Sequence, residues 1–124
     1  MKIFEKRKLM LDGIEISFDS LEWNSHPSFE GVELKHLIRA KDTNGIFSYH
    51  LVKIKPNKKI GLHIHQNQLE THEIIEGNGM CKNGNYEYVY DPGVISIFEA
   101  GVEHEIIANE KGLYLFATFI PALC

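Results

Sequence analysis

Alternation of apolar and polar residues is the feature that most constrains the fold of this chain. Residues 32–38, 50–54 and 86–90 alternate with a period of two, which is typical of half-buried β-strands because successive side chains point to opposite faces of a sheet. Turn-forming sequences separate these segments, and Asn83-Gly84 is a strong hairpin signal. No sustained helical stripe accompanies them. The pattern predicts an all-β sandwich or barrel.

The length of 124 residues is typical of a single domain. Residues 45–121 carry most of the strand pattern, whereas residues 1–44 are less regular. We expect residues 1–44 to form either the first strands of the barrel or an arm. Such an arm would pair with the edge of the barrel or with a second subunit. A domain this small often gains stability by association, so a homodimer is expected.

Charge and composition exclude several classes of partner. The formal net charge of −4 lacks the positive excess that nucleic-acid binding requires. The first residues lack the apolar stretch of a secretory signal, and the longest apolar run, Leu113–Leu123, is too short to span a bilayer. Two cysteines form no disulfide framework, which fits a reducing compartment. We therefore expect a cytoplasmic protein with a small-molecule partner, and neither a membrane nor a nucleic acid.

Seven histidines are present, and three of them fall in an informative pattern. His63 and His65 would share a face of one strand and could bind one ion with two imidazoles. Glu70 follows after four residues, enough for the chain to turn back and add a carboxylate oxygen. Further on, a turn at Ala100-Gly101 precedes a strand that opens with His104.

The spacing of these residues resembles both sequence motifs of the cupin family. The first match reads Gly61…His63-x-His65-x4-Glu70-x6-Gly77, and the second reads Gly93-x5-Glu99-x-Gly101-x2-His104. The resemblance implies a jelly-roll β-barrel, also called a double-stranded β-helix, with a metal ion in its mouth. It also implies that the ion is held by His63, His65, Glu70 and His104. Glu99 stands where the family usually has proline, which affects only the turn before His104.

The implied ligand set is chemically coherent. Three imidazoles and one carboxylate suit a divalent transition metal such as Mn, Fe, Zn, Ni or Co, and octahedral geometry would leave two positions for water or substrate. Open positions distinguish a catalytic metal site from a closed structural one. Neither motif contains cysteine, which argues against a structural zinc knuckle.

Two further histidines are candidates for proton transfer, which requires a group within hydrogen-bond reach of the substrate. His72 could replace Glu70 as a ligand, but we favour a role behind the ligands or in contact with the substrate. His50 shares a face with Val52 and Ile54, so it lies either in the core or on the pocket wall. His26 and His36 are expected to be structural.

The resemblance implies a metal-dependent enzyme acting on a small organic molecule, with dioxygenase, decarboxylase, isomerase or lyase chemistry. The fold alone does not choose among these activities. Only two arginines are present, which disfavours a phosphorylated substrate because bidentate partners for phosphate are scarce. The alternatives are a non-catalytic cupin that binds or senses a small ligand, and a structural barrel without metal.

Overall fold

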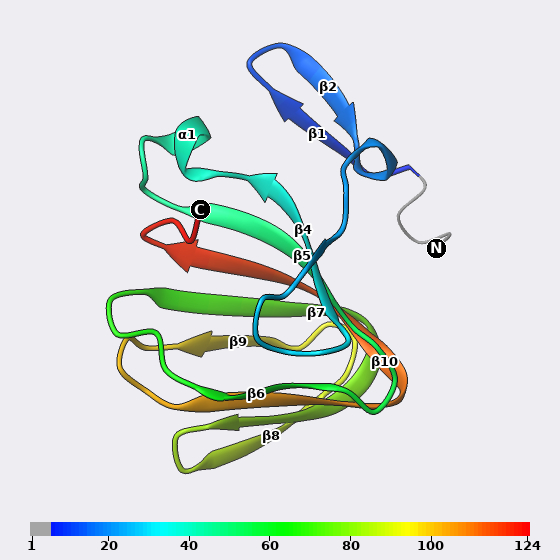
Figure 1. The fold of residues 1–124 in the computed structure, drawn as a ribbon, viewed down its shortest axis with the longest axis vertical. Helices are drawn as coiled ribbons and strands as arrows, with labels where there is room; N and C mark the ends of the chain where they lie inside the picture. The colour runs from blue at the N-terminus through cyan, green and yellow to red at the C-terminus, as the bar shows by residue number, and fades with distance from the viewer. Residues whose placement is uncertain (1–5) are drawn as a thin grey trace.

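An antiparallel sheet that folds over on itself forms most of the molecule (Figure 1). The computed structural model describes residues 6–124. The strands are β1 (Lys8–Leu11), β2 (Ile14–Ser17), β3 (Asn24–Ser25), β4 (Val32–Ile38), β5 (Ser48–Ile54), β6 (Lys59–His63), β7 (Leu69–Asn83), β8 (Tyr86–Tyr90), β9 (Ile95–Phe98) and β10 (His104–Ile120). Short helical segments occur at Phe18–Ser20 and at α1 (Ala40–Thr43). Among these residues, no helix is long and apolar enough to cross a membrane.

The two long strands, β7 and β10, connect the two layers of the barrel. They pair with each other in antiparallel register, and the register shifts between Ala108 and Leu113. The first half of β7 pairs with β9 and its second half with β8. Likewise, the beginning of β10 pairs with β6 and its end with β5. This arrangement confirms the predicted all-β jelly roll.

The bend in these strands depends on glycine. Gly77 has a positive φ of 85°, and a Cβ atom placed there would clash with the carbonyl oxygen of Gly112. A Cβ atom at Gly79 would clash with the carbonyl oxygen of Ile107, although Gly79 has no positive φ. Close approach of the β10 backbone is therefore the main reason that glycine is needed at both positions.

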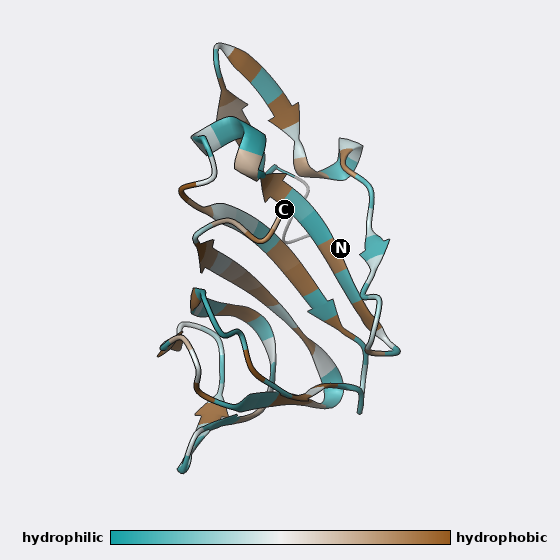
Figure 2. Cartoon of the chain, turned by 60° about the vertical axis from the view of Figure 1, so that its left-hand side comes forward, coloured by the Kyte–Doolittle hydropathy of each residue, from teal (hydrophilic) through white to brown (hydrophobic). Residues whose placement is uncertain are grey.

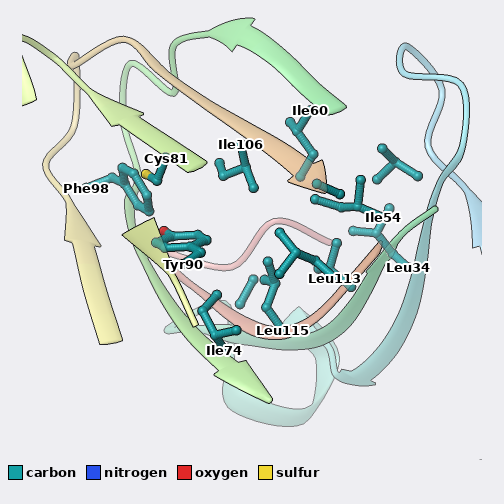
Figure 3. Packing of buried hydrophobic residues seen from close by; sticks show 14 of the residues in the cluster. Leu34, Ile54, Ile60, Ile74, Cys81, Tyr90, Phe98, Ile106, Leu113 and Leu115 are labelled. Carbon is teal, nitrogen blue, oxygen red and sulfur yellow. The ribbon is translucent and has the colours of Figure 1, made fainter. Parts of the chain in front are cut away.

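The principal core fills the space between the layers. Figure 3 shows Tyr90, Phe98 and Ile106, which come from β8, β9 and β10, in the interior with Leu113 and Leu115. A second cluster lies on the opposite face of β5 and β10, where Leu51 and Phe116 pack with Phe18 and Leu37. Bands of apolar and polar residues along the long strands, visible in Figure 2, reflect this division between faces.

The N-terminal segment contributes in two ways. β3 and β4 join the main sheet beside β5, so part of residues 1–44 forms the first strands of the barrel. β1 and β2 form a separate hairpin that projects away from the barrel in Figure 1. Residues 1–5 of the expected arm lie outside the described residues.

The strand expected at residues 86–90 is present as β8, but its predicted half-buried face is wrong. Residues 86–89 are all exposed, and Tyr86 keeps 68% of its surface accessible while stacking on Tyr88. Only Tyr90 enters the core. The reason is position: β8 is the last strand in the sheet order, so most of its length lies beyond the packed layers.

Candidate metal centre

Four side chains converge where the two layers of the barrel meet. One donor atom from each of His63, His65, Glu70 and His104 lies within 4.8 Å of the others. The structure thus brings together the four residues that the sequence motifs indicated. The two halves of the cluster come from opposite layers, because His63 and His104 belong to β6 and β10 whereas Glu70 belongs to the first half of β7.

Strand register and a loop contact place the histidines. His104 is the cross-strand neighbour of His63, and their ring centroids lie 4.1 Å apart. His65 was expected on the same strand as His63, but β6 ends at His63 and His65 lies just beyond it. The backbone N–H of Gly101 donates to the carbonyl oxygen of His65 at 2.9 Å, which ties the two loops together.

Backbone carbonyls orient two of the rings. Nδ1 of His63 lies 2.7 Å from the carbonyl oxygen of Gly61, and Nδ1 of His104 lies 3.1 Å from that of Val102. A carbonyl oxygen only accepts hydrogen bonds, so Nδ1 carries the proton in each ring and Nε2 keeps its lone pair when the ring is neutral. This arrangement is typical of metal-binding histidines.

Glu70 is the anionic member of the cluster and is 4% exposed. Its Oε1 lies 3.0 Å from Nε2 of His104 and 3.4 Å from Nε2 of His65, and its Oε2 lies 2.6 Å from Nε2 of His72. Burial would raise the pKa of Glu70, but His72 and His104 outweigh burial and hold that pKa well below its ordinary value. The carboxylate is therefore ionised at neutral pH.

The first two histidines are held in the form that binds metals. Burial lowers the pKa of both His63 and His65, and the repulsion of neighbouring imidazoles adds to that effect. Both rings are therefore neutral at neutral pH. These two neutral imidazoles and the ionised carboxylate of Glu70 are three ligands that need no deprotonation before a cation binds.

His72 lies behind Glu70 and outside the four-residue cluster. Its Nε2 faces Glu70, and its Nδ1 lies 3.0 Å from the hydroxyl of Tyr90, which in turn contacts the hydroxyl of Ser96. The Tyr90 hydroxyl can donate to Nδ1 while it accepts from Ser96, and this leaves Nε2–H of His72 to donate to Glu70. Both ring nitrogens of His72 are thus engaged within the protein.

His50 is fully buried and lies away from the cluster. Its side chain is on the inner face of β5 with Val52 and Ile54, as the alternation predicted. Its Nε2 lies 2.8 Å from Oγ of Ser48, and its Nδ1 lies 2.8 Å from Nδ1 of His36. Burial, and to a lesser degree His36, lowers the pKa of His50 to about 4, so its ring carries no charge at neutral pH.

A small cavity of about 70 Å³ adjoins the cluster. Its wall combines polar and apolar side chains: His26, Val32, Leu34, Val52, Ile60, His63, His65, Glu70, His72, Ala117, Phe119 and Leu123. None of these lining residues is a lysine or arginine. Of the two candidates for proton transfer, His72 lines this cavity and His50 does not.

Sequence reasoning missed three residues of this region. Tyr90 contacts His72, and the ring of Phe119 lies 5.2 Å from that of His65. His26 was expected to be structural. It does accept a hydrogen bond from the backbone N–H of Ser28, but it also lines the cavity. Only the aromatic content of the last strand hinted at Phe119, and no motif marked the other two.

Comparison with known proteins gives a family and a fold. A family model described as "Cupin domain" matches residues 50–119. Similar solved structures include KdgF from Halomonas sp., which is 16% identical over 83% of this chain and 90% of that chain, with a TM-score of 0.73. An RmlC-like cupin from Shewanella frigidimarina is 17% identical over 85% and 87% of the two chains, with a TM-score of 0.73.

A predicted oxalate decarboxylase from Thermotoga maritima is 24% identical over 82% of this chain and 91% of that chain, with a TM-score of 0.70. At these identities, the three structures establish the likeness of fold alone. No curated protein matches this chain.

Proposed function

This chain belongs to the cupin family, and we propose that it is a metal-dependent enzyme acting on a small organic molecule. The metal would be one divalent transition-metal ion held by His63, His65, Glu70 and His104. The observation that carries the proposal is the convergence of these four donor atoms beside a cavity.

The donor set fits such an ion. Imidazole nitrogens and one carboxylate oxygen suit Mn, Fe, Zn, Ni or Co, and four protein ligands leave coordination positions open to water or substrate. The neutral rings of His63 and His65 and the ionised Glu70 supply three of the four ligands in their binding forms. A bound ion would supply Lewis-acid stabilisation of a developing oxyanion, such as an enolate or carboxylate oxygen.

Residues around the cluster orient the four ligands and hold a proton beside them. The carbonyl oxygens of Gly61 and Val102 hold the His63 and His104 rings in place. His72 holds a proton between its Nε2 and Glu70, and so keeps that carboxylate in one orientation. Of the two candidates for proton transfer, His72 lines the cavity and His50 does not, which makes His72 the better placed.

The cavity limits the substrate. A volume of about 70 Å³ holds only a few heavy atoms beside an ion and its waters. The wall is largely apolar and supplies no lysine or arginine, which disfavours a phosphate ester because phosphate recognition relies on such cations. A small oxygen-bearing molecule undergoing dioxygenase, decarboxylase, isomerase or lyase chemistry is the best fit.

Metal retention is the first test. Protein prepared without a histidine tag would be stripped with a chelator and titrated with Mn²⁺, an ion that favours oxygen and nitrogen ligands. We expect His63→Ala and His104→Ala to abolish binding. His26→Ala is the matched control, since His26 lines the same cavity but lies outside the cluster. Full Mn²⁺ binding by His104→Ala would overturn the proposed ligand set.

Turnover is the second test. The metal-loaded protein would be incubated with a panel of small keto, hydroxy and dicarboxylic acids while dioxygen uptake and product formation are followed. Conversion that requires both the ion and Glu70 would support the enzyme. A compound that binds the loaded protein tightly but is never converted would instead favour the non-catalytic cupin that binds or senses a ligand.

The expected partner, besides the small molecule, is a second copy of this chain. The outer side chains of β9 are apolar and accessible, with Ile95 71% and Ile97 55% exposed. Burying such surface is a common reason for a small domain to associate. Light scattering at micromolar concentration would check the homodimer, and a monomer mass would contradict it.

A further inference from the structure

A second cluster of metal-ligating side chains lies outside the cupin motifs. His36, His50 and Cys124 each place one donor atom within 4.8 Å of the other two. The two Nδ1 atoms are 2.8 Å apart, and Sγ of Cys124 lies 3.7 Å from Nδ1 of His36. One imidazole is fully buried, whereas the cysteine is exposed, so the cluster is accessible from solvent on one side.

The fold holds these residues in place. His36 on β4 and His50 on β5 are direct cross-strand neighbours. The segment that carries the cysteine is tied to the barrel, because the backbone N–H of Ala40 donates to the carbonyl oxygen of Cys124 at 2.6 Å. The backbone N–H of Leu123 also donates to Oγ of Ser48, the hydroxyl that contacts His50. Hydrogen bonds thus hold the main chain at Leu123 and at Cys124, which keeps Cys124 beside the two histidines.

We propose that His36, His50 and Cys124 form a second metal site, which takes a thiophilic divalent ion such as Zn²⁺. Tetrahedral Zn²⁺ with ordinary bond lengths would place its two nitrogen ligands about 3.3 Å apart and a nitrogen and a sulfur about 3.6 Å apart. The observed separations are 2.8 Å and 3.7 Å. Binding therefore requires the two rings to part by about half an ångström, and it leaves the fourth position to water.

The protonation states suit this ion. Burial lowers the pKa of both His36 and His50, so neither ring is charged at neutral pH. One proton is now shared between the two Nδ1 atoms. On binding, the ring that carries this proton changes to its Nε2–H tautomer, and Ser48 Oγ can accept from Nε2–H of His50. The Cys124 thiol releases its proton to solvent, so one proton is released for each ion bound.

The second site is separate from the first. The ring of Phe119 lies 5.6 Å from that of His50 on one side and 5.2 Å from that of His65 on the other. The ligand chemistry also differs, because the first cluster contains no sulfur. A spectroscopic signal that depends on sulfur therefore reports the second site alone.

Titration with Co²⁺, a spectroscopic substitute for Zn²⁺, tests the proposal. The untagged full chain, kept reduced with a non-thiol reductant, would be stripped of metal and titrated while its near-ultraviolet spectrum is recorded. We expect an intense thiolate-to-cobalt charge-transfer band, and its loss in Cys124→Ser. Cys81→Ala is the matched control and should keep the band, because Cys81 is buried elsewhere in the core.

Two further variants distinguish the three-residue site from binding at the first cluster or at the cysteine alone. Glu70→Gln should keep the band, since Glu70 belongs only to the first cluster, and His36→Ala should lose it. A band that survives in His36→Ala would show that the thiolate binds Co²⁺ without His36 and would overturn the three-residue site. Absence of the band in the unmodified protein at excess Co²⁺, or its persistence in Cys124→Ser, would also overturn it. Circular dichroism of each variant checks that the barrel is folded.

Discussion

Acid should destabilise this protein through His50, whose side chain is fully buried beside Ser48 and His36. Burial is the main cause that lowers its pKa from 6.5 to about 4; the nearby His36 and Arg39 add to the effect, and Glu70 opposes it. The unfolded chain takes up a proton on this residue as the pH falls below 6.5, whereas the folded protein does so only near pH 4. The free energy of unfolding must therefore fall across this window as acid is added.

The magnitude follows from the two pKa values. The interval between 6.5 and about 4 corresponds to about 3 kcal/mol once the pH is below both values. About 2.5 kcal/mol of this is already lost at pH 4.5. That loss is a large fraction of the stability of an ordinary small domain, which is about 5–15 kcal/mol. At neutral pH the contribution is fully present, because neither the folded nor the unfolded state then carries the proton.

Urea unfolding of the metal-free protein between pH 7 and pH 4.5 measures this effect. His50→Gln removes the titrating group, so its stability should fall less with acid than that of the unmodified protein, by about 2.5 kcal/mol at pH 4.5. Val52→Ala, two residues along the same strand face, is the control. It should lower stability at every pH without changing the slope, because it removes only packing. Parallel pH profiles for His50→Gln and the unmodified protein would refute the reasoning.

Three other predictions concern the metal centre and the bend of the barrel. Glu70→Gln should abolish Mn²⁺ retention. His72→Gln should weaken Mn²⁺ binding about 10- to 100-fold, because the Glu70 carboxylate is then no longer held in one orientation. If titrations show equal losses of affinity for the two variants, His72 is itself a ligand. Tyr90→Phe should lower the free energy of unfolding in urea by about 1–2 kcal/mol and also weaken Mn²⁺ binding, because His72 loses its hydrogen-bond partner at Nδ1. An unchanged Mn²⁺ affinity would show that the Tyr90 hydroxyl does not influence the metal site. Gly77→Ala should destabilise the protein more than Gly45→Ala, since both have positive φ but only a Cβ at Gly77 meets backbone; equal losses in unfolding midpoint would show that strain in φ alone matters.

The barrel strands could be predicted because local alternation and turn chemistry agree with the tertiary structure. Val32 and Leu34 of β4 enter the principal core as the alternation predicts, up to a register shift between His36 and Ile38. Asn83-Gly84 opens the turn between β7 and β8. The exposure of β8 could not be predicted in this way. Alternation records only which side chains share a face, and whether that face is covered depends on where the strand lies in the sheet.

The cluster of His36, His50 and Cys124 shows a different limit of prediction from sequence. His36 and His50 meet because β4 and β5 pair in one register, and Cys124 joins them because its segment returns to the barrel beside Ser48. No motif spans these positions, and the sequence interpretation treated His36 as structural. A one-residue slip of β4 against β5 would turn one imidazole to the opposite face of the sheet. Such a site is a product of long-range register and becomes visible only in the folded chain.

The choice between Glu70 and His72 as the ligand shows what side-chain geometry adds to the alternation of residues along a strand. Both residues lie on the same face of β7, so the period of two cannot distinguish them. Their hydrogen bonds do, because both nitrogens of His72 are engaged, by Tyr90 on one side and Glu70 on the other. Glu70, in contrast, directs Oε1 toward His65 and His104. A cation at the cluster would therefore meet the carboxylate first, and His72 would act on it only through that carboxylate.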